Sequence, residues 1–301
     1  MSWLLVAISA YFLFATVSLV DKYLLAGPLP NPKVYAFYVG ILGLLVLFLV
    51  PFVGFYYPGP FEVSLAFLSG AFFIFGLFWL YKAIRTFEVS RIIPAVGGTL
   101  PIFSFSLIYI FSKGGEIFKI GEFSAFILLI LGSILITYEK AKKISLESLK
   151  ISVIAAFFLA LSFVLAKYVY MVQPFWSGYV WIRIGGFLMA MSFLFAQEVR
   201  NELSKVKMNF PKKTAAIFLS NQAAGASANI LQNLAIALAP LVGVAIINAL
   251  QGVQYVFLLM FATLLSLKFP QILKEEISRE IIFQKIIAIL LIGAGLTLLA
   301  I

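Results

Sequence analysis

Ten long apolar stretches, separated by short polar connections, dominate this sequence. The hydrocarbon layer of a bilayer is about 30 Å thick, so a helix that crosses it needs about 20 predominantly apolar residues. Most of the stretches reach that length, which predicts an all-α integral membrane protein with ten transmembrane helices. The predicted segments are 3–26, 34–54, 61–87, 90–111, 121–138, 151–172, 175–197, 213–238, 240–267 and 281–301.

The composition agrees with this prediction. The 301 residues are 63% hydrophobic and 11% charged, whereas a soluble domain is about one quarter charged. Too little polar surface is available to cover a water-soluble globule, so we expect the lipid bilayer to surround the chain. The formal charge of +10 comes from basic residues in the connections between apolar segments. Membrane topology explains that placement better than nucleic-acid binding, and we expect no nucleic-acid partner.

The chain is internally repeated. Lys22-Tyr23 recurs as Lys167-Tyr168, 145 residues later. The same offset pairs Phe12 with Phe157, Ala15 with Ala160 and Gly40 with Gly185. Five segments in each copy is an odd number, so the second copy enters the bilayer upside down relative to the first. We therefore expect two inverted five-helix repeats, residues 1–138 and 151–301, joined by the charged linker 139–150.

The distribution of basic residues predicts an orientation. With ten spans, the odd-numbered connections carry eighteen of the 22 Lys and Arg residues. Basic residues concentrate on the cytoplasmic side of membrane proteins, so the count places both termini on the outside. We expect a multi-pass protein of the cell membrane.

Carboxamide side chains form two stripes at helical spacing. Gln222, Asn229 and Asn233 share one face of the eighth segment, and Asn248, Gln251 and Tyr255 follow in the ninth. Unpaired amides are costly inside a bilayer, so we expect these six residues to line a substrate-binding cavity. The alternative is that these side chains form hydrogen bonds between helices, each of which contributes about 0.6 kcal/mol to stability.

Four further residues are candidates for the same cavity. Tyr11 in the first segment and Trp79 in the Phe-rich third segment are expected to shape its apolar wall. Arg183, eight residues into its segment, and Lys167 are possible charge partners of a solute. The alternative for both cations is that their long side chains reach back to the membrane surface.

Residues that are absent narrow the chemistry. The sequence has neither Cys nor His, and no Asp or Glu lies near the centre of a predicted segment. We therefore expect no metal site, no cofactor and no catalytic residues, and we do not classify the chain as an enzyme. Proton coupling lacks an obvious carrier and no phosphate-binding loop of the Walker type is present, which favours a facilitator or exchanger.

Several of these details together resemble the EamA-like ten-helix members of the drug/metabolite transporter superfamily. They are the five-plus-five plan, the short connection between the third and fourth segments, the loop Gly114-Gly115-Glu116, and the charged stretch Lys274-Glu275-Glu276 before a last apolar segment. The resemblance covers nearly the whole chain. It implies a pseudo-symmetric bundle with a central cavity, export or exchange of small metabolites, and termini in the cytoplasm, in conflict with the charge count.

The sequence therefore favours a secondary transporter, an exporter or exchanger of small organic metabolites that works by alternating access. Its expected partner is a small-molecule substrate. One alternative is a membrane-embedded enzyme acting on lipid-linked substrates, and another is a non-transporting membrane scaffold. The substrate, the coupling ion, the direction of flux and the oligomeric state do not follow from the sequence.

Overall fold

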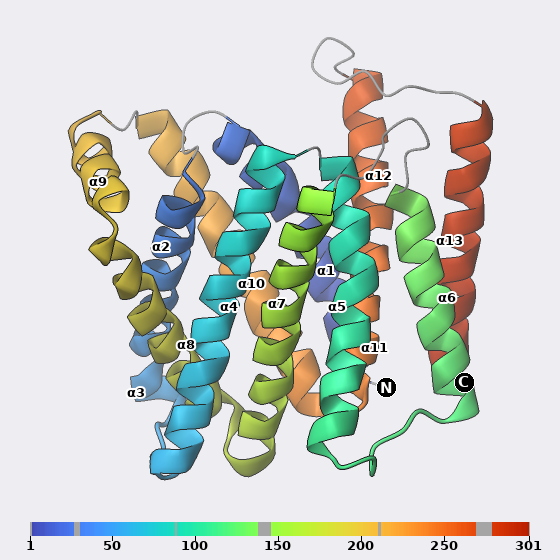
Figure 1. Cartoon of the computed structure of the whole chain (residues 1–301), viewed down its shortest axis with the longest axis horizontal. Helices are drawn as coiled ribbons and strands as arrows, with labels where there is room; N and C mark the ends of the chain where they lie inside the picture. The colour runs from blue at the N-terminus through green and yellow to red at the C-terminus, as the bar shows by residue number, and fades with distance from the viewer. Residues whose placement is uncertain are drawn as a thin grey trace.

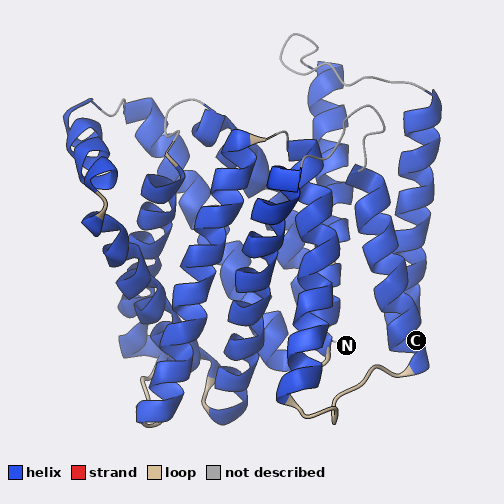
Figure 2. Ribbon diagram, in the orientation of Figure 1, coloured by secondary structure: helices blue, strands red, loops and turns tan. Residues whose placement is uncertain are grey.

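The computed structural model describes residues 2–26, 31–87, 89–137, 146–209, 212–268 and 279–300. In these ranges every regular element is a helix, which confirms the all-α prediction (Figure 2). The long helices lie side by side as a bundle, and both termini lie at the same end of it (Figure 1). The elements are α1 (Ser2–Ala26), α2 (Pro32–Gly43), η1 (Leu44–Leu49), α3 (Val50–Val53), α4 (Pro60–Thr86), α5 (Val89–Phe111), α6 (Ile120–Thr137), α7 (Leu146–Val172), α8 (Phe175–Ser192), η2 (Phe193–Phe195), α9 (Gln197–Asn209), α10 (Lys212–Leu238), α11 (Gly243–Ala249), α12 (Gln251–Lys268) and α13 (Arg279–Ala300).

Eight helical stretches of the described residues are long and apolar enough to cross a membrane. In chain order they are Ser2–Leu25, Pro32–Val53, Pro60–Thr86, Ile120–Thr137, Leu146–Val172, Phe175–Phe195, Gly243–Phe261 and Phe283–Ala300. α5 contributes the shorter apolar stretch Ala95–Phe111. α10 is not among the eight because its carboxamides and serines lower its mean hydropathy. The chain is thus a multi-pass membrane protein by length and composition, and its ten-helix count stays a prediction.

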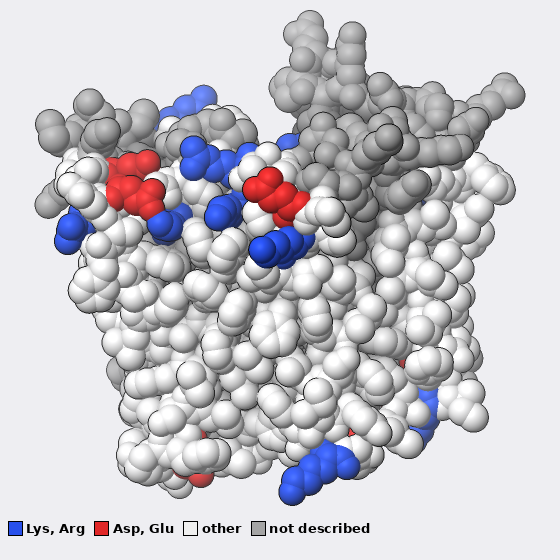
Figure 3. Space-filling model, in the orientation of Figure 1, with Lys and Arg blue, Asp and Glu red and all other residues white. Residues whose placement is uncertain are grey.

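Charged side chains gather near one end of the bundle. On the face shown in Figure 3 most Lys, Arg, Asp and Glu residues form a belt at the end opposite the termini, above a surface almost free of charge. Large apolar side chains are exposed among the described residues, including Phe52 at 85% and Phe61 at 74%. Such exposure is expected where lipid, rather than water, is the solvent.

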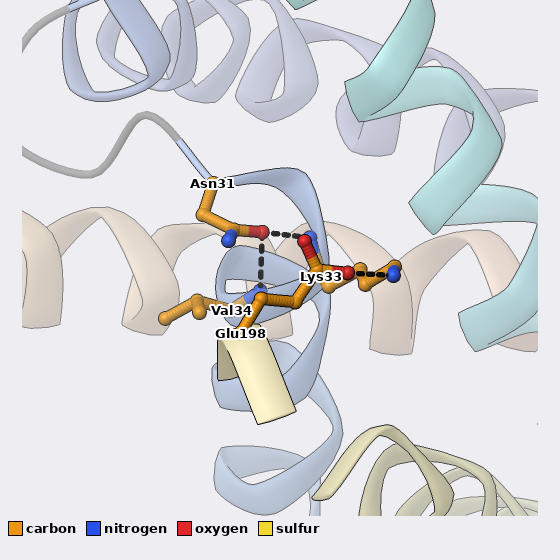
Figure 4. A network of polar contacts seen from close by, with 4 residues as sticks. All are labelled: Asn31, Lys33, Val34 and Glu198. Atoms are coloured by element: carbon orange, nitrogen blue, oxygen red, sulfur yellow. Dashed lines mark hydrogen bonds and ion pairs between the residues drawn. The ribbon is translucent and has the colours of Figure 1, made fainter. Parts of the chain in front are cut away.

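α2 begins within this charged end, at a well-defined cap. The Asn31 side-chain oxygen accepts hydrogen bonds from the backbone N–H groups of Lys33 and Val34, at 3.0 and 3.4 Å (Figure 4). Pro32 occupies the first helical position, where its missing N–H is not needed. Lys33 forms an ion pair with Glu198 of α9, which joins α9 to the start of α2.

The structure differs from the predicted segments at several places, of which three bear on the arrangement of the helices. α7 begins at Leu146, inside the predicted linker 139–150, of which residues 139–145 lie outside the described residues. α9 lies in the connection between the predicted segments 175–197 and 213–238, where the polar sequence gives no sign of a membrane-spanning helix. The predicted ninth segment is two helices, α11 and α12, separated at Leu250.

The two predicted halves pack mainly against each other. α4 contacts α7 and α8 along much of its length, α1 contacts α10, and α6 contacts α13. The largest buried cluster draws its side chains from both halves, including Tyr11, Ile108, Phe163 and Ile247. Residues 2–137 and 146–300 therefore share one core instead of forming two separate bundles.

Glycines allow α4 to approach α8 closely. A Cβ atom at Gly70 would lie 1.9 Å from the Ile182 carbonyl oxygen, and one at Gly185 would lie 2.4 Å from the Phe67 Cα. Both distances are far below van der Waals contact. The backbones themselves are in contact here, which is the arrangement that small residues provide between membrane helices. We call Gly70, Gly185 and Gly186 the glycine contact.

We expect Gly70→Ala to destabilise the protein by about 1–3 kcal/mol, because the added methyl group overpacks a contact between two backbones. Chemical unfolding in mixed detergent micelles measures the change. Gly293→Ala is the matched control, since a Cβ at Gly293 would have no atom of the described residues within 4 Å. Equal stability of the two variants would contradict the close approach of α4 and α8.

Candidate functional site

Five polar side chains from three helices meet inside the bundle. They form the arginine–amide cluster, which consists of Tyr170, Tyr179, Arg183, Asn229 and Asn233. The Asn229 side-chain oxygen accepts from Arg183 Nη2, from the Tyr179 hydroxyl at 3.1 Å and from Asn233 Nδ2 at 2.9 Å. Arg183 Nη2 also donates to the Tyr179 hydroxyl at 2.7 Å, and Tyr170 donates to the Asn233 oxygen at 2.8 Å.

Helical spacing positions the members of this cluster. Tyr179 and Arg183 are four residues apart on α8, and Asn229 and Asn233 are four apart on α10, so each pair shares one helix face. Tyr170 reaches the cluster from the last two turns of α7. Asn229 and Asn233 are each 5% exposed, which is why their amides need protein partners.

Arg183 lies at about half the depth of the bundle. It follows Phe175, the first residue of α8, by eight residues, or about 12 Å at 1.5 Å per residue. Its guanidinium carbon is 4.8 Å from the centre of the Tyr179 ring and 5.3 Å from that of Phe73. Aromatic faces attract a cation and partly replace its hydration. The side chain is therefore held between rings and amides instead of extending to the membrane surface.

No carboxylate of the described residues pairs with Arg183. Within those ranges, the ion pair found is that of Lys33 with Glu198, at the charged end. The hydrogen-bond acceptors around Arg183 are the neutral oxygens of Tyr179 and Asn229. A positive charge thus lies inside the bundle without a neutralising partner from the described part of the chain.

A small cavity lies against this cluster. Its volume is about 10 Å³, roughly the space of one water molecule. Both halves line it: Gly70 and Phe73 come from α4, Phe163 from α7, Arg183 from α8 and Asn229 from α10. The cavity borders the glycine contact, so the close approach of α4 and α8 limits its size.

A larger hollow, of about 420 Å³, opens between α1, α10 and α12. Its lining is mainly apolar, and Ser9, the polar residue there, has its hydroxyl bonded to the Leu5 carbonyl at 3.0 Å. A polar solute finds few groups there to orient it. The smaller cavity is therefore the better candidate site.

Tyr11 and Tyr255 lie in a different part of the core. The Tyr11 hydroxyl donates to the Ile247 carbonyl of α11 at 2.7 Å and accepts from Gln232 at 3.4 Å. Tyr255 packs beside Gly97, where an added Cβ would lie 3.1 Å from its hydroxyl. Neither tyrosine lines the cavity at Arg183. The structure gives Tyr11 a role in joining α1 to α10 and α11.

Asn248 and Gln251 do not join the arginine–amide cluster. The Asn248 amide donates to the Ser104 hydroxyl of α5 at 2.7 Å. The side-chain oxygens of Asn248 and Gln251 are buried and have no hydrogen-bond partner among the residues described. The two carboxamide stripes therefore do not face one shared cavity in this structure.

Trp79 lies on α4 among other aromatic side chains. Its ring centre is 5.4 Å from that of Phe78 and 6.2 Å from that of Phe75, and the Lys82 ammonium lies 4.7 Å from it. Its indole N–H has no partner in the described part of the chain. The aromatic residue of α4 that lines the cavity is Phe73 instead.

Gln222 belongs to a polar group near the charged end. Its amide lies 3.5 Å from the Tyr35 hydroxyl, which donates to the Asp21 carboxylate. The same carboxylate oxygen accepts from Asn221 at 2.6 Å. Side chains of α10 thereby bind the end of α1 and the start of α2.

Lys167 has a structural role. Its ammonium donates to the carbonyl oxygens of Ala237 at 3.0 Å and Ala239 at 2.5 Å, at the C-terminal end of α10. The last carbonyls of a helix lack partners within it, and a cation is favoured there. Lys167 is 6% exposed, so it neither extends to the surface nor faces the cavity, whereas its repeat counterpart Lys22 is exposed.

Sequence reasoning missed the two tyrosines of the cluster, Tyr170 and Tyr179. A hydroxyl four residues before Arg183 was a usable signal for Tyr179, because that spacing puts both side chains on one helix face. Tyr170 gave no such signal. Its contact with Asn233 depends on how α7 packs beside α10.

We expect Lys167→Met to lower stability by about 1–3 kcal/mol, since two buried carbonyls lose their donor. Lys22→Met is the matched control, because Lys22 holds the equivalent repeat position but is exposed. Unfolding in mixed micelles compares the two variants. If both variants are as stable as the unmodified protein, the capping of α10 by Lys167 does not contribute significantly to stability.

Comparison with known proteins gives a fold and no family. No family model matches the chain, and no curated protein sequence matches it. Solved structures do match; one of them, described only as "Crystal structure of protein", has a TM-score of 0.69 and 15% sequence identity. The match covers 99% of this chain and 98% of that chain. At that identity the likeness shows the fold alone, over essentially the whole length of both chains.

Proposed function

We propose that this protein is a secondary transporter that moves small organic metabolites across the cell membrane by alternating access. The supporting observation is the arginine–amide cluster beside a cavity lined by both halves of the chain. Polar and charged groups inside a membrane bundle typically mark a solute pathway. A site at half depth, between two halves of a repeated chain, is the usual position of a transporter's binding site.

The arrangement of the helices supports an inverted repeat. α1 begins at the end of the bundle where the termini lie, and α7 begins at the opposite end (Figure 1). α4 is the third long helix of the first half, and it packs on α7, the first helix of the second half. α10 is the equivalent third helix of the second half, and it packs on α1. The in-plane two-fold axis of the proposed inverted repeat would relate the first of these contacts to the second. With α5 and α10 added to the eight apolar stretches, the proposed number of spans is ten.

The two halves also differ in a way that alternating access requires. α4 packs extensively on α8 through the glycine contact, whereas α10 meets α2 over a much shorter stretch, near Tyr35. Under the proposed symmetry these two contacts are equivalent. We infer that, as the transporter alternates, the α4–α8 contact loosens while the α10–α2 contact becomes close. The solute is then released first on one side of the membrane and then on the other.

The resemblance to the EamA-like drug/metabolite transporters is consistent with this proposal. It rests on the five-plus-five plan and on short local patterns. We therefore treat membership of that family as part of the proposal.

Replacement of Asn229 tests the site. Asn229→Leu removes the oxygen on which three donors converge, and we expect at least about a 10-fold loss of transport. Tyr179→Phe removes one hydroxyl and is expected to cause a smaller loss. Purified protein in liposomes is incubated in uniformly ¹³C-labelled cell extract, and mass spectrometry identifies the solutes that enter.

The control for that experiment is Asn201→Leu, a change on the exposed surface of α9. It is expected to transport like the unmodified protein. If no labelled solute enters the protein-containing liposomes faster than protein-free liposomes, the transport proposal is wrong. If solutes enter and neither site variant reduces the rate, transport takes place elsewhere in the molecule.

The charge distribution gives a proposed orientation. The end where Lys and Arg gather on the face drawn in Figure 3 is proposed to face the cytoplasm, and the termini lie at the other end (Figure 1). We therefore expect a reporter fused after the last residue to be active only outside the cytoplasm. A reporter that is active in the cytoplasm would instead agree with the orientation implied by the family resemblance.

A further inference from the structure

We infer that the arginine–amide cluster binds a small monoanion, a monocarboxylate with an apolar body. This inference rests on the proposed function and specifies its substrate class. It starts from a single fact, which is that Arg183 is a cation at half depth without a carboxylate partner among the described residues. A charge in that position is costly unless an opposite charge joins it during the working cycle.

The hydrogen bonds of the cluster are one-sided. Arg183, Tyr179 and Asn233 all donate to one neutral oxygen, that of Asn229. Three donors directed at one point describe a site with a surplus of donors and a shortage of negative charge. An anionic oxygen accepts such bonds more strongly than an amide oxygen does, because a charged acceptor roughly doubles their strength.

Arg183 also has unused donors. Its Nη2 atom makes both of its hydrogen bonds, and within the described ranges its Nη1 and Nε atoms make none. A guanidinium group offers two parallel N–H donors that match the two oxygens of a carboxylate. The side chain is already fixed by Tyr179, Asn229 and the ring of Phe73, so little conformational freedom remains to be lost when an anion binds.

The charge balance selects a monoanion. One cation neutralises one negative charge, and among the described residues Arg183 is the Lys or Arg that lines the cavity. A phosphate ester, which carries nearly two negative charges, would leave one uncompensated in the membrane. Phe73, Phe163 and Ile182 give the lining an apolar part that suits a hydrocarbon or aromatic body. Ser69 and Ser162 also line the cavity, and the Ser69 hydroxyl donates to the Ser162 carbonyl at 2.9 Å.

The present cavity, at about 10 Å³, is too small for such a solute. Entry therefore requires the cavity to widen, and separation of α4 from α8 at the glycine contact beside Arg183 is the movement that we propose. The structure thus corresponds to a closed site. Binding of the anion is coupled to the separation of α4 from α8, because these two helices close the cavity and also carry Phe73 and Arg183.

Three pairs of a carboxylate and its neutral amide test the inference: benzoate with benzamide, phenylacetate with phenylacetamide, and isovalerate with isovaleramide. Thermal unfolding of the purified full chain is measured with each compound at constant ionic strength. We expect at least one acid, and no amide, to raise the unfolding temperature. Arg183→Gln is expected to weaken acid binding roughly 30-fold or more, and Arg183→Lys to weaken it less.

Arg200→Gln is the matched control, since Arg200 is exposed on α9, and it is expected to bind the acids normally. The inference is overturned if no acid stabilises the protein more than its amide does. It is equally overturned if acid binding survives Arg183→Gln, or if phenyl phosphate stabilises the protein more than benzoate.

Uptake from the labelled extract separates this inference from the transport proposal. Uptake of neutral or cationic solutes that is unchanged in Arg183→Gln would overturn the anion site and retain transport. Binding of the acids that depends on Arg183, without uptake of any solute, would retain the anion site and overturn transport.

Discussion

The structure depends on one constraint, which is that lipid offers no hydrogen bonds to a polar group. Each polar side chain placed between the helices therefore needs a partner from the protein or from a bound solute. Lys167 meets this requirement with the carbonyls at the end of α10, and Asp21 meets it with Tyr35 and Asn221. Arg183 meets it only in part, with neutral oxygens and aromatic rings. Among these three charged side chains, the lack of a full set of partners distinguishes Arg183 from Lys167 and Asp21.

The same constraint explains how the two halves are joined. Hydrophobic attraction between helices is weak in lipid, so association relies on close packing and on hydrogen bonds. α4 uses close packing against α8, through Gly70 and Gly185. α1 uses hydrogen bonds to the second half: Tyr11 binds the Ile247 carbonyl, and Ser18 accepts from Gln254 at 2.8 Å. One interface is held by backbone shape and the other by polar side chains.

Much of the fold could be predicted from the sequence, because segment length and hydropathy are local properties. The all-helical architecture and the positions of most long helices followed from them. α9 and the break at Leu250 did not, since a polar surface helix and an interrupted apolar segment leave no signal in hydropathy alone. For the site, helical spacing correctly placed Asn229 and Asn233 on one face. It failed to separate them from Asn248 and Gln251, because which neighbour a helix face meets depends on tertiary packing. For Lys167, the two carbonyls that bind it lie 70 and 72 residues away in the sequence, beyond the reach of any local pattern.

The glycine contact has a consequence for how this sequence can vary. Where side chains interdigitate, one of them can change size while its neighbours adopt new rotamers. Where two backbones touch, no rotamers exist to absorb a change, and any larger residue pushes whole helices apart. Positions 70 and 185 therefore admit almost no substitution, while Gly293 on α13, which faces open space, is free to change. At positions 70 and 185 mutational tolerance is accordingly set by the distance between the helix axes, and only secondarily by the chemistry of the new residue.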